Sequence, residues 1–230
     1  MDGQSDVPEE FNKIINEMLN VVIADYGIVN LRNIRQGFEY INASVTVTDD
    51  PEKVRVSDAL VLPGVGAFGD GMEELCRRNL DEAITECAGR GGFILGVCLG
   101  MQMLMCTGSE YGSKPGLGLI EGEVERIPAK ENGKTIRKIP HIGWNRIYGL
   151  QGEDDWETTC LKTTPQFEEF YFVHSYQAVP LNRSHILAYT TYEGLEINAA
   201  VSCDNVTGLQ FHPERSGEAG LAVLKEFVSR

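Results

Sequence analysis

Short apolar runs alternate with segments of helical period through the first half of the chain, and this alternation constrains the fold more than any other feature of the sequence. The segment 31–41 carries apolar residues at 31, 34, 38 and 41, which predicts an amphipathic helix, and further helices are predicted over roughly 70–90 and over 99–105. Strands separated by helices pair in parallel, with the helices on the faces of the sheet. The predicted strands are NVVIAD (20–25), ASVTVT (43–48), ALVL (59–62) and GGFILGV (91–97).

The second half of the chain is rich in strands and poor in helices. The pair Asp204-Asn205 stands between two apolar runs and predicts a hairpin, and the segment 216–230 predicts a C-terminal helix. We therefore expect an α/β fold whose mixed sheet is parallel at first and is then extended by antiparallel strands. The predicted strands of this half lie in 116–127, 141–147, 167–179, 184–192 and 197–211.

Length, composition and charge limit the classes of protein to which the chain can belong. With 230 residues, of which 42% are hydrophobic and 23% charged, it has the composition of a globular protein with a sizeable core. The formal net charge of -14 argues against nucleic acid as a partner, because phosphates would be repelled. The sequence has no apolar run of membrane-spanning length and no signal-peptide pattern, so we expect a cytoplasmic protein that does not contact the membrane.

The first 20 residues differ from the rest of the chain. They hold five acidic residues against one lysine, and apolar residues recur in them at helical spacing. We expect residues 1–20 to form an acidic amphipathic extension that packs on its own domain or docks on a partner, and residues 21–230 to form one domain. The recurring apolar residues are Phe11, Ile14, Ile15, Met18 and Leu19.

The chain has six cysteines, and Cys98 is the one with a distinctive local sequence, Gly96-Val97-Cys98-Leu99-Gly100. A nucleophile between a strand and a helix needs small residues two positions before and after it, since the backbone turns sharply there. The helix N-terminus favours a thiolate, and the N–H of Leu99 can face an oxyanion. The alternative is a buried cysteine in a tight turn. None of the cysteines forms a CxxC pair or a zinc pattern, so we expect neither metal nor cofactor.

A base for Cys98 must come from one of four histidines. His212 follows an apolar strand, and Glu214, two residues later, can orient its imidazole as the third member of a triad does. His174 lies within a predicted strand and is interpreted as structural, His141 is expected at the surface, and His185 is expected to start a strand. A second oxyanion donor is expected from PGVG (63–66), whose glycines allow unusual peptide orientations, although a plain tight turn has the same sequence.

Together these motifs resemble those of the class I (triad) glutamine amidotransferases, and the resemblance covers residues 20–230. The finer motifs DYG (25–27), LPGVGAFGDGM (62–72), HIGWN (141–145), FYFVHSY (170–176) and FHPERSG (211–217) are similar to those of the HisH glutaminase subunits. The resemblance implies a flavodoxin-like three-layer sandwich. Two features depart from the family pattern, which usually has a glycine where this chain has Val29 and lacks the acidic extension.

The resemblance also implies roles for individual residues. Cys98 would attack the side-chain amide of glutamine, His212 would move protons, and Glu214 would orient His212. The remaining implied positions are the oxyanion-hole amides of Leu99 and of Val65 or Gly66, the glutamine-binding residues Gly64, Gln102, Glu110, Ser175 and Tyr176, and the partner-facing Trp144 and Arg215.

A partner is implied as well. In the family, a HisF-type cyclase subunit forms a heterodimer with the glutaminase, receives the ammonia, and makes imidazole glycerol phosphate and AICAR in histidine biosynthesis. Three alternatives stay open at this point. They are a HisH-like glutaminase that supplies ammonia for amidation of a surface-polysaccharide sugar, a free-standing γ-glutamyl Cys hydrolase, and a non-catalytic regulatory subunit.

Overall fold

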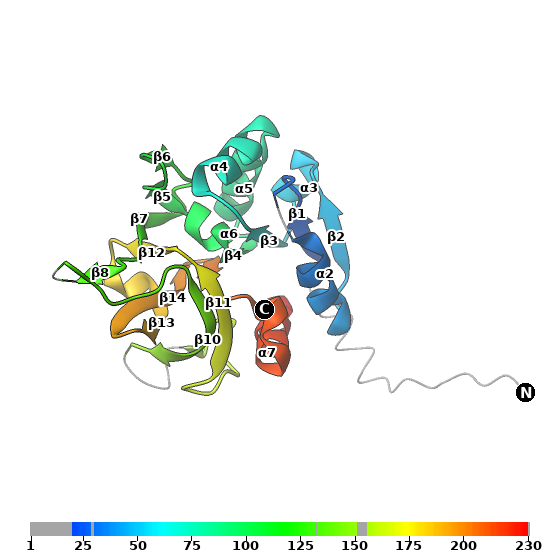
Figure 1. The fold of residues 1–230 in the computed structure, drawn as a ribbon. Helices are drawn as coiled ribbons and strands as arrows, with labels where there is room; N and C mark the ends of the chain where they lie inside the picture. Colours follow the sequence, from blue (N-terminus) through cyan, green and yellow to red (C-terminus); the bar gives the residue numbers. More distant parts are fainter. Residues whose placement is uncertain (1–19, 29, 132, 151–155, 230) are drawn as a thin grey trace, which may run out of the picture.

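The computed structural model describes residues 20–28, 30–131, 133–150 and 156–229, so most of the predicted extension and Val29 lie outside the described residues. Its main feature is a nine-stranded sheet in the order β11-β10-β13-β14-β15-β4-β3-β1-β2 (Figure 1). One half of this sheet is parallel, as the alternation predicts. Its strands are β1 (Val21–Ala24), β2 (Val45–Thr48), β3 (Ala59–Gly64), β4 (Phe93–Cys98) and β15 (Val206–Leu209).

Antiparallel strands extend the sheet on the side of β15, which confirms the predicted mixed sheet. The predicted hairpin at Asp204-Asn205 joins β14 to β15, and Asp204 takes the positive φ of 51° that a tight turn requires. The strands of this half are β10 (His141–Gly149), β11 (Glu169–His174), β13 (Ile186–Tyr192) and β14 (Leu195–Cys203).

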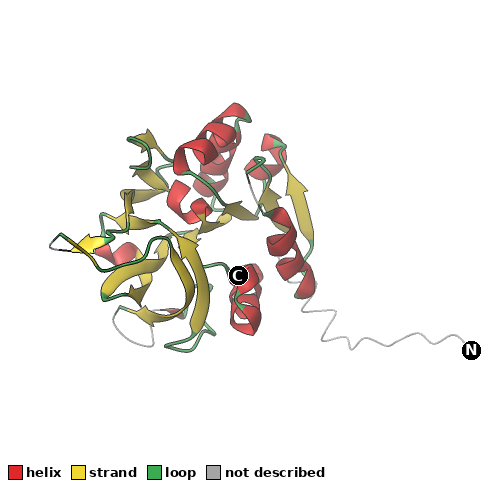
Figure 2. Ribbon diagram, in the orientation of Figure 1, coloured by secondary structure: helices red, strands yellow, loops and turns green. Residues whose placement is uncertain are grey.

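Helices cover both faces of the parallel half, which makes the three layers of the expected sandwich (Figure 2). Side chains alternate along each strand, so Val21 and Ile23 pack with α2 (Leu31–Tyr40) and α7 (Gly217–Val228). Val22 and Ala24 face the opposite layer. That layer consists of α3 (Pro51–Arg55), α4 (Phe68–Arg77), α5 (Leu80–Gly89) and α6 (Leu99–Met103). Among the described residues no helix is long and apolar enough to cross a membrane.

Two helix predictions were wrong in extent. The single helix expected over 70–90 is two helices, α4 and α5, because Asn79 adopts a left-handed conformation with φ 56° and breaks the hydrogen-bonded ladder. The helix expected over 99–105 ends at Met103, because Met105 pairs with Ile120 at the start of the strand β5.

A second, four-stranded sheet in the order β12-β7-β5-β6 was not expected from the sequence. The predicted strand 167–179 divides at Ser175, and its two parts enter different sheets, β11 the large one and β12 the small one. Alternation within the segment shows no sign of this break, since both parts are half-buried strands. The strands of the small sheet are β5 (Met105–Gly108), β6 (Lys114–Pro115), β7 (Ile120–Arg126) and β12 (Tyr176–Pro180).

Three short elements complete the described chain. A two-stranded ribbon joins β8 (Lys130–Glu131) to β9 (Lys134–Thr135). His185 does not start a strand as expected. It ends the 3-10 turn η2 (Arg183–His185), in which Asn182 caps the N–H of Ser184. A second 3-10 turn, η3 (Pro213–Arg215), follows β15.

Phe38 tests the packing of α2 on the sheet. It is fully buried and its ring lies 6.3 Å from that of Phe227 on α7. We expect Phe38→Ala to lower the free energy of unfolding by about 3–5 kcal/mol, through lost burial and the cavity that remains. Urea unfolding measures this change. Tyr40→Ala is the matched control, because Tyr40 lies on the same helix with 77% of its surface exposed, and it should change the stability by less than about 0.5 kcal/mol.

Candidate active site

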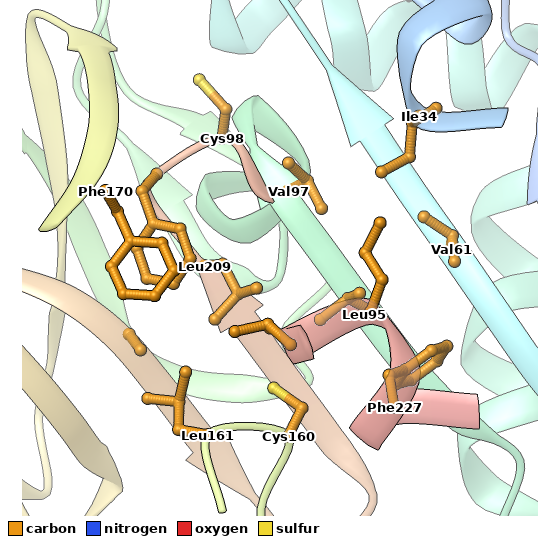
Figure 3. Close-up of a cluster of buried hydrophobic side chains, with 14 of the residues drawn as sticks. Ile34, Val61, Leu95, Val97, Cys98, Cys160, Leu161, Phe170, Leu209 and Phe227 are labelled. Carbon is orange, nitrogen blue, oxygen red and sulfur yellow. The ribbon is translucent and has the colours of Figure 1, made fainter. Parts of the chain in front are cut away.

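Cys98 is the last residue of β4, and α6 begins at the next residue. Its backbone has φ 55° and ψ -109°, a conformation that is strained for a residue with a side chain and typical of a nucleophile at a strand–helix turn. A Cβ at position 100 would collide with the carbonyl of Leu62, and one at position 96 would lie 2.8 Å from the Gly100 backbone. Both glycines are therefore required, as predicted. Figure 3 shows the Cys98 side chain pointing away from the apolar cluster at Leu95 and Phe227.

The loop after β3 lies directly beside this turn, because Gly64 pairs with Cys98 across the parallel ladder. Val65 is partly exposed, and Gly66 has φ 102°, which favours glycine. Both residues line the same cavity as Cys98. Gly64, expected to bind glutamine, does not line the cavity, and a Cβ at this position would collide with the Tyr26 hydroxyl and approach Leu99 Cβ to 2.8 Å.

His212 and Glu214 meet in the turn that follows β15. Glu214 Oε1 lies 2.8 Å from His212 Nδ1, and both side chains are nearly buried, at 5% and 6% exposed. The backbone holds the histidine from both sides, since its N–H donates to the Tyr171 carbonyl at 2.9 Å and its own carbonyl accepts from Ser216 Oγ at 2.7 Å. The pairing expected from the sequence is thus present in the structure.

The charge state of His212 is set by its neighbours. Burial by itself lowers the pKa of the His212 imidazole, but interactions with Cys98 and with Glu214 outweigh it and raise the pKa to about 10. The other ring nitrogen, Nε2, is buried without a hydrogen-bond partner among the described residues. These neighbours therefore favour the imidazolium form of His212, a proton donor beside the sulfur of Cys98.

A cavity of about 320 Å³ opens over Cys98, at the lower end of the range of ligand pockets. Glu110 reaches it, and its Oε2 accepts a hydrogen bond from the N–H of Phe68 at 2.9 Å. The Nε2 of Gln102 donates to the carbonyl of Tyr176 at 3.1 Å. Of the residues that sequence analysis assigned to the site, nine line this cavity, namely Val65, Gly66, Cys98, Leu99, Gln102, Glu110, Ser175, Tyr176 and His212.

The sequence did not identify Gln210 as a residue of this site. Gln210 is fully buried, and its Nε2 donates to Cys98 Sγ at 3.7 Å, although it was assigned to a strand without any role. The signal that could have found it is strand alternation, because Gln210 lies two residues before His212 and so shares its face. Gln210 does not line the cavity itself, whereas Pro140, Val173 and His174 line it and were not assigned to it.

His141 is not at the surface as expected. It is fully buried, because it pairs with His174 across β10 and β11, and its Nδ1 lies 2.9 Å from His174 Nε2. Its ring also stacks at 4.1 Å on Tyr192. His174 Nδ1 contacts the Tyr176 carbonyl at 2.8 Å, so both of its ring nitrogens have partners. His174 thus has the contacts expected of the structural histidine predicted from the sequence.

Trp144 and Arg215 both contact Tyr171, whose carbonyl accepts the hydrogen bond from the His212 N–H. Arg215 stacks its guanidinium 4.3 Å from the centroid of the Tyr171 ring, and Trp144 lies edge-on to the same ring at 6.0 Å. Trp144 is 53% exposed, so it lies at the surface and not in the core. We name Trp144, Tyr171 and Arg215 the aromatic–arginine cluster.

A larger cavity, of about 650 Å³, lies between α4, α5 and β6. Cys76 lines it, but burial and the adjacent Asp81 raise the pKa of this thiol to about 11, which disfavours a nucleophile. Within the described ranges no group of three metal-binding side chains occurs. The cavity over Cys98, by contrast, combines a cysteine with a histidine that is paired with a carboxylate.

Comparison with known proteins agrees with this geometry. The family described as glutamine amidotransferase class-I matches residues 22–230. The chain is 45% identical over 211 residues to imidazole glycerol phosphate synthase subunit HisH 1 of Legionella pneumophila (strain Lens), which covers 92% of this chain and 99% of that protein. The chain belongs to the HisH family of class I glutamine amidotransferases. A HisH subunit of Chlorobium luteolum is 41% identical over 208 residues, covering 90% of this chain and 98% of the relative.

Two solved structures share the fold of this HisH-family protein. PurLQS from Thermotoga maritima has a TM-score of 0.66 at 22% identity, covering 91% of this chain and 97% of that one. Another structure described as a glutamine amidotransferase has a TM-score of 0.65 at 17% identity, covering 88% and 95%. The predicted class I glutamine amidotransferase fold is confirmed, and the family identifies the chain as an enzyme of this type.

The buried His174 makes stability depend on pH. Burial is the main cause that lowers its pKa to about 3, so between about pH 6.5 and pH 3 the unfolded chain binds more protons than the folded one. The stabilisation is complete above pH 6.5 and is lost as the pH falls. We expect the depressed pKa of this histidine to lower the free energy of unfolding by about 2 kcal/mol as the pH falls from 7 to 5.

Urea unfolding at several pH values measures this loss. His174→Gln should show a shallower decrease below pH 6.5, while the difference between variant and wild type should stay constant between pH 7 and pH 8. Equal slopes for the two proteins below pH 6.5 would contradict the assignment.

Proposed function

We propose that this HisH-family chain is the glutaminase subunit of imidazole glycerol phosphate synthase in histidine biosynthesis. It hydrolyses glutamine to glutamate and ammonia in the cytoplasm and passes the ammonia to a HisF-type cyclase, which makes imidazole glycerol phosphate and AICAR. The observation that carries the proposal is the buried His212–Glu214 pair beside Cys98 at a cavity of about 320 Å³. The names of relatives that are 41–45% identical over nearly their whole length support it.

The proposed reaction begins with a thiolate. Cys98 Sγ attacks the side-chain amide carbon of glutamine, and the imidazolium of His212 gives its proton to the departing nitrogen, which leaves as ammonia. Water then attacks the thioester while His212 takes its proton, and glutamate leaves as the Cys98–carbon bond breaks. Glu214 keeps His212 in the orientation and charge state that both steps need.

Backbone amides would stabilise the oxyanion of both tetrahedral intermediates. The N–H of Leu99 comes from the start of α6, and that of Val65 or Gly66 comes from the loop after β3. Gly64 supports both groups by letting Leu99 pack against β3. We propose that its contribution to substrate binding is this packing.

The amino-acid end of glutamine would bind on the opposite wall. The Glu110 carboxylate can accept from the ammonium group, and its hydrogen bond from the Phe68 N–H already fixes its position. Gln102, Ser175 and Tyr176 line the same wall. We also propose that residues 21–230 are the catalytic domain and that residues 1–20 extend it, since the family match begins at residue 22.

Glu214→Gln tests the triad. Without the carboxylate the pKa of His212 loses one of the interactions that raise it, and the imidazole loses its orienting charge. We expect the rate of glutamine hydrolysis by the complex to fall by roughly 10²–10⁴-fold. Release of glutamate measures this rate. Glu218→Gln, an exposed change on α7, is the matched control and should retain the wild-type rate. An unimpaired Glu214→Gln enzyme would refute the triad.

The partner would cover the aromatic–arginine cluster, so that ammonia leaves the cavity without meeting water. Tryptophan and arginine contribute strongly to interfaces, and Trp144→Ala should weaken binding of a HisF-type cyclase by about 2–4 kcal/mol. Titration calorimetry measures this loss. Leu181→Ala removes an exposed side chain, 74% accessible, at the end of the small sheet and should bind normally. Wild-type affinity of the Trp144→Ala protein would place the interface elsewhere.

One experiment separates this function from the alternatives. The purified chain with a HisF-type cyclase should make imidazole glycerol phosphate from glutamine and the phosphorylated ribulose precursor. Failure of that reaction, with glutaminase activity intact, would favour amidation of a sugar. High glutaminase activity of the isolated chain would favour a free-standing hydrolase, because the proposed subunit needs its partner.

A further inference from the structure

Gln210 places a buried amide against the candidate nucleophile. Its side chain is fully buried, and its Nε2 lies 3.7 Å from Cys98 Sγ. Among the described residues the sulfur is the only acceptor for this Nε2. A buried N–H without a good acceptor costs about 1–3 kcal/mol, so the acceptor strength of the sulfur matters here.

The orientation of the amide follows from its neighbours. The carbonyl of Tyr176 can only accept, so Gln102 must present its NH₂ group to it, at 3.1 Å. The same Gln102 NH₂ group donates to Gln210 Oε1 at 3.0 Å. Turning the Gln210 amide around would bring two NH₂ groups together. Its NH₂ therefore faces Cys98, and this assignment needs no assumption about Cys98 itself.

The thiol and thiolate forms of Cys98 need different hydrogen-bond partners. A thiol can donate to the Val173 carbonyl, which lies 3.9 Å from Sγ, whereas a thiolate has no proton to donate and needs donors instead. Gln210 supplies such a donor from within the core, where a hydrogen bond to a charged group is strong. The hydrogen bond from Gln210 therefore stabilises the thiolate more than it stabilises the thiol.

We propose that Gln210 is a further functional residue of this site, which stabilises the thiolate of Cys98 and is held in register by Gln102. This inference rests on the proposed function in taking Cys98 as the nucleophile. It also connects two walls of the cavity, because Gln102 lines the proposed glutamine site and orients the donor for the sulfur.

Alkylation of Cys98 tests the inference without glutamine. The full chain is treated with iodoacetamide between pH 5 and pH 10, and modification of the Cys98 peptide is followed by mass spectrometry. Gln210→Met removes the donor at similar size, and we expect the rate to fall about 10-fold on the rising limb of the pH profile, as loss of a charge-assisted hydrogen bond implies. The pH profile should move upward by about one unit, with the same plateau.

A second variant tests whether the rate of alkylation follows the hydrogen-bonding group at position 210. Gln210→Glu keeps an acceptor for Gln102 but replaces the donor by a negative group, so it should slow alkylation more than Gln210→Met does. Thr190→Val is the matched control, because it removes a buried hydrogen bond, from Thr190 Oγ1 to the Arg146 carbonyl at 2.8 Å, on a strand that does not line the cavity. It should destabilise the fold comparably and leave the profile unchanged.

Superimposable profiles for wild type, Gln210→Met and Gln210→Glu would overturn the inference. If the variants do not fold, the wild-type chain labelled with ¹⁵N at glutamine side chains provides the same test. The Gln210 amide resonance should shift as Cys98 ionises, and an amide that does not respond to pH or to alkylation excludes the interaction.

The outcome for the proposed function is separate. Normal glutaminase activity with unshifted variant profiles rejects the role of Gln210 alone. Shifted profiles in a complex without glutaminase activity reject the proposed function and leave the interaction standing. If the proposed function and the role of Gln210 are both correct, Gln210→Met should lower kcat for glutamine with little change in KM.

Discussion

The site depends on one constraint, the positive φ of Cys98 at the end of a buried central strand. β4 lies between β3 and β15, so its last residue leaves the sheet with neighbours on both sides. The turn into α6 is possible because positions 96 and 100 are glycines, and a Cβ at either position would collide with the neighbouring backbone. The packing of Gly100 against Leu62 holds the strained residue in place, and the sulfur points into a cavity instead of the core.

The two strands beside β4 bring the other groups to this point. The parallel register sets Gly64 next to Cys98 on one side and Leu209 next to Val97 on the other. Residues that follow these strands therefore emerge at the same edge of the sheet, as the carboxyl ends of parallel strands do. The loop with Val65 and Gly66 and the turn with His212 reach Cys98 by this simple geometry.

The remaining wall comes from the break at Ser175. Here the chain leaves the large sheet after His174 and enters the small sheet at Tyr176, passing over the cavity. The carbonyl of Tyr176 then fixes Gln102, and Gln102 fixes the amide of Gln210. The small sheet thus acts on the nucleophile through three hydrogen bonds, the last of which ends on sulfur.

Local sequence determined those parts of the protein that depend on near neighbours. Strand and helix periods gave the parallel half and the hairpin at Asp204-Asn205, the glycine spacing identified the turn at Cys98, and the two-residue spacing paired His212 with Glu214. Only the tertiary structure decided the small sheet, the burial of His141 against His174, the exposure of Trp144, and the contact of Gln210 with sulfur. Each of these features depends on which distant strand becomes a neighbour. The hydrophobic periodicity of a segment indicates which residues are buried, but it does not indicate which residues they pack against.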